Sequence, residues 1–333
     1  MNAKLKSALT LAAKICVAVG MVLFLVKSGH LDLHVVWNLM TFPNVVLALL
    51  LVGGNILLAA WRWIILLKAR GFYIPFAYGF SLYLIGMFFN YALPGAVSGD
   101  LVRGYYLVQD YPGRKMDSVL SVLIDRILGL YSFFILSLGA ILWDFDFVAN
   151  HEKIRWVAGV CMIVFLGMTG FFMLSFSTRL YHMSGLRKII EKIGPLHQLM
   201  EGFQRFGKDR RILGISIFVS VMAQVFTIMF FYYLGIVLGE PGATLQAILF
   251  AVPMGFVVTA IPIAPAGVGV GQMAFLYLFQ TYMNKHSQFG AIAITTYQLS
   301  TAAWALFGVV FYLRRRKPHE LENLESKMEV ATT

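Results

Sequence analysis

The chain has 333 residues, of which 59% are hydrophobic and 13% charged, and its formal net charge at pH 7 is +11. Soluble domains carry about 25% charged residues, so this composition excludes a soluble globular protein and indicates an integral membrane protein. The apolar runs exceed the ~20 residues that a spanning helix needs, and they lack the alternation of barrel strands. We therefore expect an all-α polytopic membrane protein.

The apolar runs, taken in chain order, predict six full transmembrane helices and two interrupted segments. The full spans lie at about 8–27, 43–67, 118–142, 155–176, 211–238 and 288–313, and the interrupted segments, which contain Pro and Gly breaks, lie at about 74–93 and 245–283. Residues 178–210 place apolar residues at helical spacing among basic ones, which predicts an amphipathic helix on the inner leaflet. Residues 1–313 are thus expected to form a single transmembrane domain, followed by a charged tail at 314–333.

The distribution of Lys and Arg predicts the orientation in the membrane. If the N-terminus and the segments 68–74, 100–117, 178–211 and 314–317 share one side, that side holds 19 of the 27 Lys and Arg residues. The positive-inside rule makes that side cytoplasmic, so both termini are expected in the cytoplasm. Each interrupted segment then starts and ends on the same side, as a re-entrant hairpin or as a pair of short spans.

The order of spans and breaks repeats with opposite orientation, which predicts an inverted repeat of about 8–142 and 155–313. A shift of 171 residues lays the second span on the fifth, the third on the sixth, and Pro94 on Pro265. Inverted repeats with helices broken at matching positions are typical of transporters, with the binding site between the breaks. Chance register among similar apolar helices is the alternative explanation.

Five charged residues lie in or beside apolar segments, where ionisable side chains are costly and so suggest function. They are Arg62, Asp100, Arg103, Asp125 and Arg126. Internal ion pairing, with Arg62 reaching toward the interface, would be a purely structural explanation. Because guanidinium groups bind phosphate bidentately, three arginines toward the cytoplasmic half also predict a polar cavity that receives a phosphate head group.

Both breaks are expected to line that cavity, since irregular backbone in mid-membrane needs protein or water around it. The residues concerned are Asn90, Pro94, Gly95 and Gly99 at the first break, and Pro262, Pro265, Gly267, Gly269, Gly271 and Gln272 at the second. The second break lacks the Lys-Ser/Thr end of a nucleotide-binding loop, which argues against an ATP site. The seven histidines are dispersed, so neither a metal nor another cofactor is expected.

Three motifs resemble one family. "LPGAVSGDLVRGYYL" at 93–107, "DRILGL" at 125–130 and "PIAPAGVGVGQ" at 262–272 are similar to the lysylphosphatidylglycerol synthase transmembrane-region family, the membrane part of the multiple peptide resistance factor, a bacterial lipid aminoacylase and flippase. Ser98 replaces the first of two paired glycines in the family's P-G-x-x-G-G-D-x-x-R pattern. Gln272 stands where many relatives have Glu, which argues against neutralisation of a cationic head group or proton coupling there.

The resemblance covers roughly 10–315 and implies a flippase-like fold, with a lipid-sized cavity between re-entrant helices. The soluble aminoacyl-transferase domain of the two-part enzyme follows its membrane region. Here only about 20 residues follow Leu313. We therefore expect that this chain does not synthesise an aminoacyl lipid by itself.

The leading hypothesis is binding and flippase-like translocation of a polar or anionic lipid, such as an anionic phospholipid or a lipid-linked head group. One alternative is a membrane-embedded lipid-modifying transferase that uses Asp100 or Asp125 as a base. Another is a scaffold that recruits a cytoplasmic lipid synthase through 178–211. Membrane lipids are the expected partners, association with a second copy is left open, and no nucleic-acid partner is expected.

Overall fold

The computed structural model describes residues 20, 22–92, 98–176, 194–207, 209–259 and 267–314, which form helices and turns with no strand among them. Five helices in this part are long and apolar enough to cross a membrane. They are α3 (Phe42–Ala69), α6 (Lys115–Trp143), α8 (Glu152–Phe176), α12 (Arg210–Val237) and α15 (Phe289–Leu313). The all-α membrane fold and five predicted spans are confirmed, while most of the predicted span at 8–27 lies outside the described residues.

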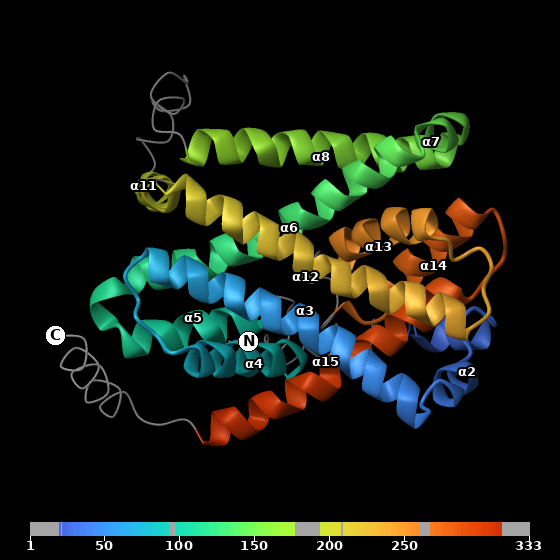
Figure 1. Cartoon of the computed structure of the whole chain (residues 1–333), viewed down its shortest axis with the longest axis horizontal. Helices are drawn as coiled ribbons and strands as arrows, with labels where there is room; N and C mark the ends of the chain where they lie inside the picture. The colour runs from blue at the N-terminus through green and yellow to red at the C-terminus, as the bar shows by residue number, and fades with distance from the viewer. Residues whose placement is uncertain are drawn as a thin grey trace, which may run out of the picture.

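Local sequence explains where two of these helices begin. Helix α3 starts after Thr41 with Pro43 in its first turn, where the missing N–H of proline costs no helical hydrogen bond. Helix α12 is capped by Asp209, whose carboxylate accepts from the backbone N–H groups of Arg211 and Ile212. The start of α12 lies at the basic end of the bundle, described below, and α3 begins at the opposite end (Figure 1).

Each interrupted segment forms two helices on either side of its break. The first gives α4 (Phe76–Ala92) and α5 (Ser98–Asp110), and the second gives α13 (Leu245–Thr259) and α14 (Val270–Met283). The helices of each pair pack against one another. The breaks themselves, 93–97 and 260–266, lie outside the described residues, and with them Pro94, Gly95, Pro262 and Pro265.

Helix α5 forms much of the segment 100–117, which the charge distribution assigns to the basic side. Residues 98–110 are helical, and the Arg103 side chain is only 4% exposed. Buried partners, rather than water, therefore surround this arginine. A 3-10 turn, η1 (Pro112–Arg114), then leads into α6.

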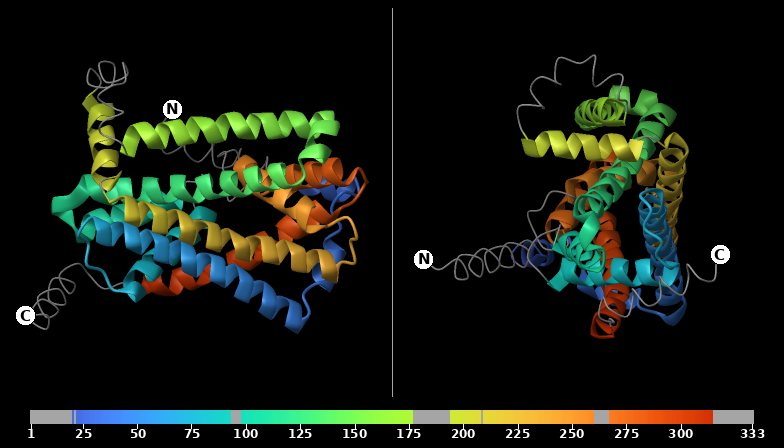
Figure 2. Two further views of the ribbon diagram at one scale, coloured as in Figure 1. Left: turned by 45° about the horizontal axis from the view of Figure 1, so that its top comes forward. Right: turned by 90° about the vertical axis from the view of Figure 1, so that its left-hand side faces the viewer.

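The long helices form a bundle in which α3 and α12 lie side by side, as Figures 1 and 2 show. Helix α4 packs on α15, and α13 packs on α6. Helix α8 runs along one side of the bundle in Figure 1, and the short helices α2 (Leu33–Asn38) and α7 (Phe145–Asn150) lie at one end of it.

Helix α11 (Gly194–Gly207) is the described part of the predicted amphipathic segment, with residues 177–193 and 208 outside the description. Phe203 and Phe206 are 1% and 3% exposed and pack with residues of α3, α6 and α8. The Arg70 guanidinium lies 5.1 Å from the centre of the Phe206 ring. These apolar residues of α11 are therefore covered by the protein itself rather than by lipid.

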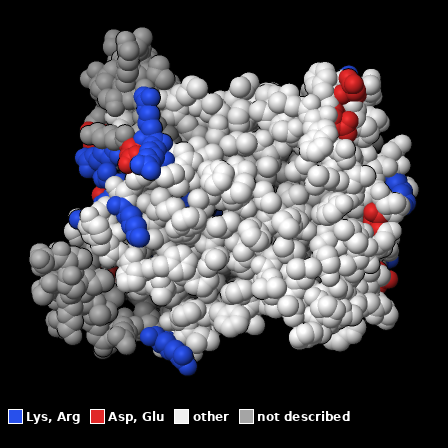
Figure 3. All heavy atoms as spheres, in the orientation of Figure 1, with Lys and Arg blue, Asp and Glu red and all other residues white. Residues whose placement is uncertain are grey.

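Positive charge gathers at one end of the bundle. Figure 3 shows Lys and Arg side chains at the end where α3 finishes and α12 begins, whereas acidic and basic residues mix at the opposite end. Exposed Lys68, Arg210 and Arg211 belong to the basic end, and Glu240 and Lys285 form an ion pair in the loops of the other end. The distribution agrees with the asymmetry that the positive-inside rule uses.

Glycines bring the arms of the first hairpin into backbone contact. A Cβ atom built on Gly99 of α5 would overlap the carbonyl oxygen of Gly86 in α4. We expect Gly99→Ala to separate the arms and to lower the midpoint of thermal unfolding in detergent by several degrees. Gly139→Ala in α6 is the matched control, because a Cβ there meets nothing within 4 Å. Equal midpoints for the two variants would contradict the close packing of the hairpin.

Candidate functional site

A network of three arginines and two aspartates joins three helices. Arg62 comes from α3, Asp100 and Arg103 from α5, and Asp125 and Arg126 from α6. Asp125 accepts from Arg62 Nε at 2.8 Å and from Arg103 Nη2 at 3.0 Å. Asp100 pairs with Arg103 at 3.3 Å and also with Arg126 Nη1. The structure thus brings all five predicted charged residues together.

The Arg103 side chain is buried, with only 4% of its surface exposed. Its guanidinium carbon lies 4.4 Å from the ring centre of Trp63 and 4.9 Å from that of Tyr83, so two aromatic faces hold the cation. The Trp63 indole N–H in turn donates to Ser121 Oγ at 3.2 Å, which fixes the ring. The structure therefore gives Arg103 a fixed place in the wall of the site.

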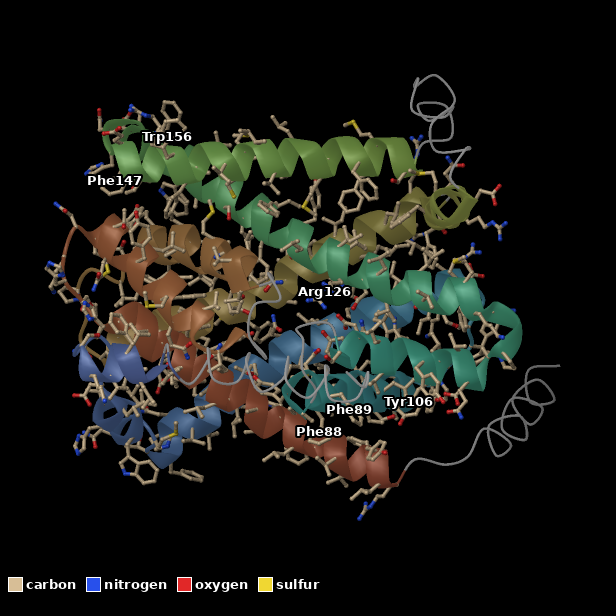
Figure 4. All side chains as sticks on the ribbon, turned by 180° about the vertical axis from the view of Figure 1, so that it is seen from behind. Phe88, Phe89, Tyr106, Arg126, Phe147 and Trp156 are labelled. Atoms are coloured by element: carbon tan, nitrogen blue, oxygen red, sulfur yellow. The ribbon has the colours of Figure 1, made fainter. Side chains whose placement is uncertain are left out.

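The network has a buried core and a more open edge. Side-chain exposure is 5% for Arg62, 3% for Asp125 and 4% for Arg103, but 20% for Asp100 and 31% for Arg126. Figure 4 places Arg126 near the middle of the molecule on α6. It is the twelfth residue of that helix, about 16 Å along it at 1.5 Å per residue. Arg126 is thus the arginine of the network most open to an incoming group.

A cavity of about 400 Å³ adjoins the network. Its lining residues come from α3, α4, α5, α6, α12, α13 and α15 and include all five charged side chains. The neutral polar side chains in the lining are Asn55, Tyr83, Asn90, Tyr91, Gln224, Thr259, Tyr297, Gln298 and Thr301. The volume is within the range of roughly 300–1,000 Å³ that is usual for small-molecule sites.

The charged lining residues carry a net positive charge. Three arginines and two aspartates leave one positive charge in excess. Every carboxylate of the network already accepts from two guanidinium groups. Such a cavity suits a singly charged anion, because a phosphate oxygen placed at Arg126 would balance the excess charge.

Asn90 and Gly99, which flank the first break, are joined by a hydrogen bond beside the site. Asn90 lines the cavity, and its Oδ1 accepts from the backbone N–H of Gly99 at 2.8 Å. This bond spans the undescribed residues 93–97 and joins the end of α4 to the start of α5. It positions Asp100, the next residue, beside Arg126.

The described residues that follow the second break, from Gly267 to Gln272, contact residues of the cavity wall. Gly267 and Gly269 have φ of +71° and +83°, which glycine adopts without strain. Gln272 accepts from Gly269 N at 2.7 Å and donates to Gln298 Oε1 at 2.7 Å, and Gln298 lines the cavity. A Cβ on Gly271 would lie 3.2 Å from Gln298 Nε2. Gln272 and Gly271 thus contact Gln298, whereas Gly267 lies against Thr259, which also lines the cavity.

Sequence reasoning missed the neutral polar residues of the lining. Asn55 and Gln224 lie in the middle of apolar helices, and this placement is a signal that could have identified them. Asn55 Nδ2 donates to Ala223 O at 2.8 Å and to Thr227 Oγ1 at 3.0 Å, which links α3 to α12. Tyr83 and Tyr91 carried no distinguishing signal among the many aromatic residues of the chain.

The described residues hold no group of three His, Cys, Asp or Glu side chains that could bind a metal ion. What the site can do follows from its arginines, its amides and its hydroxyl groups. Together, the helical fold with interrupted segments and the charged internal cavity define a polytopic α-helical membrane protein with a polar cavity in its interior.

The chain belongs to the lysylphosphatidylglycerol synthase TM region family, whose model matches residues 11–308. The family is associated with membrane lipids by its name. A curated relative, UPF0104 membrane protein PH1989 of Pyrococcus horikoshii, is 24% identical over 295 residues, which cover 82% of this chain and 87% of the relative. No solved structure matches the chain.

Asp125 offers a direct test of the network. Asp125→Ala should destabilise the protein by about 3–5 kcal/mol, because it leaves the buried Arg62 and Arg103 without their shared partner. Unfolding in detergent by heat or denaturant would measure the change. Glu201→Gln, which removes a carboxylate from a pair whose side chains are 50% exposed or more, is the control and should cost less than about 1 kcal/mol. If Asp125→Ala lowered the free energy of unfolding by as little as Glu201→Gln does, the network would not be a structural core.

Proposed function

We propose that the chain binds a polar, anionic lipid through the phosphate of its head group and translocates it, flippase-like, across the bacterial inner membrane. The main support for this proposal is the cationic cavity in the interior of a membrane fold, with Arg126 at its more exposed edge. A phosphate cannot cross hydrocarbon at low cost, because its desolvation is not compensated there. Membership in a family named for a membrane lipid supports a lipid as the ligand.

The arrangement of the helices supports the proposal that two inverted, structurally equivalent halves form the transport fold. If residues 8–142 and 155–313 are equivalent halves, then α3 corresponds to α12, α4 to α13, α5 to α14, and α6 to α15. Exchange of the halves converts the α4–α15 contact into the α13–α6 contact and leaves the α3–α12 contact in place. The cavity draws its lining from both halves, as expected for a substrate site at a repeat interface.

In this mechanism the head group enters the cavity while the acyl chains stay in the lipid. Arg126 exchanges part of its pairing with Asp100 for the lipid phosphate, and Asp100 keeps its contact with Arg103. The enclosed Arg62, Arg103 and Asp125 hold the wall in place. The two interrupted segments are proposed to be re-entrant hairpins whose tips admit the head group.

The proposed activity is not enzymatic. A general base needs a carboxylate that can reach a substrate proton, whereas Asp100 and Asp125 are each held by two arginines. A scaffold for a cytoplasmic synthase is also less well supported, because the buried apolar residues of α11 pack on its own chain. Lipid translocation is the better-supported function, because it gives a role both to the charged network and to the cavity beside it.

Substitution of Arg126 tests the head-group contact. We expect Arg126→Gln to weaken binding of an anionic phospholipid roughly 10- to 150-fold, the loss of one charged hydrogen bond, and to slow its translocation. Arg126→Lys should retain only part of the wild-type binding and translocation, because lysine keeps the positive charge but lacks the two-pronged guanidinium group. Translocation of a fluorescent anionic phospholipid in liposomes containing the purified protein measures the rate.

Three further variants separate this role from others. Arg205→Gln removes an exposed positive charge outside the cavity and should leave the rate unchanged. Arg103→Ala should also reduce transport, but with a loss of stability, since it removes one of the two arginines that pair with the buried Asp125. Asp100→Asn should preserve or tighten lipid binding, whereas a transferase with Asp100 as base would lose all turnover. Wild-type transport by Arg126→Gln would refute the proposed contact.

The proposed orientation places the basic end and both termini in the cytoplasm. Helices α7 and α11 lie at opposite ends of the bundle in Figure 1. In a background lacking Cys16 and Cys161, a cysteine at Asn150 should react with an impermeant thiol reagent added outside intact cells. A cysteine at Gln198 should react only after the membrane is opened. The reverse pattern would invert the orientation and the direction of entry.

A further inference from the structure

Six helices of the bundle form a closed ring of contacts beside the cavity. In order round the ring they are α6, α5, α4, α15, α14 and α13, and each packs against the next, with α13 packing against α6 to close it. All of them except α14 contribute residues to the cavity lining. The cavity can therefore widen where one of these contacts between neighbours opens.

Polar groups hold the first hairpin to both of its neighbours. Asp100 and Arg103 of α5 form the ion pairs with α6 described above. On the other side, the Tyr91 hydroxyl of α4 donates to Gln298 O of α15 at 3.2 Å and shares a hydrogen bond with Thr301 Oγ1 at 2.5 Å. Separation at either contact would leave charged or polar groups unpaired inside the membrane fold, which is costly.

Helix α15 touches both hairpins with its backbone. A Cβ atom on Gly308 would overlap the carbonyl oxygen of Leu84 in α4, and one on Gly290 would overlap that of Phe275 in α14. Gln272 of α14 adds a hydrogen bond to α15 at 2.7 Å. Small residues let membrane helices pack this closely, and the close packing gives them their attraction. Both hairpins are thus joined firmly to one spanning helix.

The contact between α13 and α6 is apolar. The Phe133 ring of α6 stacks on the Phe256 ring of α13 with ring centres 5.0 Å apart, and both residues line the cavity. No hydrogen bond or ion pair joins α6 to α13 in the part of the chain that the structure describes. Lipid tails are as apolar as these side chains, so they can replace the lost contacts when the two helices separate. This contact is therefore the least costly of the ring to open.

A hydrogen bond keeps the second hairpin attached to α6 at the end of the bundle opposite the basic end. The Tyr282 hydroxyl of α14 donates to the carboxylate of Asp144, which directly follows α6, at 2.5 Å. Phe133 lies about 15 Å from that end of α6, at 1.5 Å per residue. The apolar contact can thus open beside the cavity while the far end stays joined.

We propose that α6 and the second hairpin separate at Phe133 and Phe256, while the other contacts of the ring stay closed. This α6–α13 seam is then the moving part of the protein. Its opening joins the cavity to the surrounding lipid tails, which makes room for the acyl chains of a lipid whose head group lies inside. The inference adds a movement to the proposed function, and helix positions test it without any assay of transport.

Zinc bridges across the ring test the seam. Two histidine rings that bind one Zn²⁺ tetrahedrally through nitrogens at about 2.0–2.1 Å have centres roughly 5 Å apart, which matches the spacing of Phe133 and Phe256. We expect zinc to slow translocation of the fluorescent anionic phospholipid by Phe133→His/Phe256→His roughly tenfold or more, because it holds the seam closed. The reference is the same variant with a chelator.

A second pair of histidines is the matched control. Phe89 of α4 and Tyr312 of α15 have ring centres 5.3 Å apart, across a contact that is expected to stay closed. Zinc should leave the rate of Phe89→His/Tyr312→His unchanged, although the zinc content per protein shows that the bridge has formed. Equal slowing of both variants, or an unchanged rate of the first with zinc bound, would overturn the proposal.

Spin-label distances follow the seam whether or not the histidine variants are active. In a background lacking Cys16 and Cys161, labels at the exposed Val119 of α6 and Met273 of α14 report across the seam, whereas labels at Met273 and Leu306 of α15 report across a closed contact. Double electron–electron resonance in lipid nanodiscs should give two distance populations for the first pair and a single narrow one for the second.

The possible results separate the seam from the proposed function. A single narrow population for both pairs of labels would refute the moving seam and leave anionic-lipid binding standing. Two populations across the seam, in a protein that translocates no anionic phospholipid in liposomes, would support the seam and refute the proposed function.

Discussion

The site depends on one carboxylate held between two guanidinium groups in the interior of a membrane fold. Asp125 neutralises part of the charge on Arg62 and Arg103, which neither water nor lipid could solvate there. Because these residues belong to α6, α3 and α5, the ion pairs also tie an arm of the first hairpin to two spanning helices. A buried charge cluster is costly to assemble, and its cost is offset only when every member has partners. The wall of the cavity is therefore held by the same groups that make it cationic.

Within this frame the arginines have unequal surroundings. Arg103 lies between two aromatic rings and two carboxylates, whereas Arg126 stays partly open beside Asp100. The charged side chains of the lining all come from the first half of the chain, and the second half contributes only neutral polar and apolar groups. If the halves descend from one repeat, they have kept a common packing while only one of them carries the charges.

The spanning helices could be predicted from the sequence because the length of an apolar run is a local property that does not depend on packing partners. It also identified the charged residues, since Asp, Glu, Lys and Arg are rare in apolar segments. It assigned residues 100–117 to the basic side by their charge, but it could not show that Arg103 on α5 is buried, because burial depends on the partners that fold against it. Asn55 and Gln224 escaped notice for a related reason, since uncharged polar residues interrupt an apolar pattern only weakly. The unequal exposure of Arg103 and Arg126 arises from contacts between residues far apart in sequence.

The backbone contact between Gly86 and Gly99 limits how this chain can vary. Where two helix backbones touch, the usual freedom to exchange one apolar side chain for another is absent, and enlargement at one position has no compensating reduction at the other. Neighbouring layers of the bundle can repack around changes of volume, but this point cannot. The start of α5, and with it the spacing between Asp100 and Arg126, is therefore set by atoms of the main chain that every residue type shares. Changes in the cavity would have to arise on the surrounding walls, while the geometry of the Asp100–Arg126 pair stays as it is.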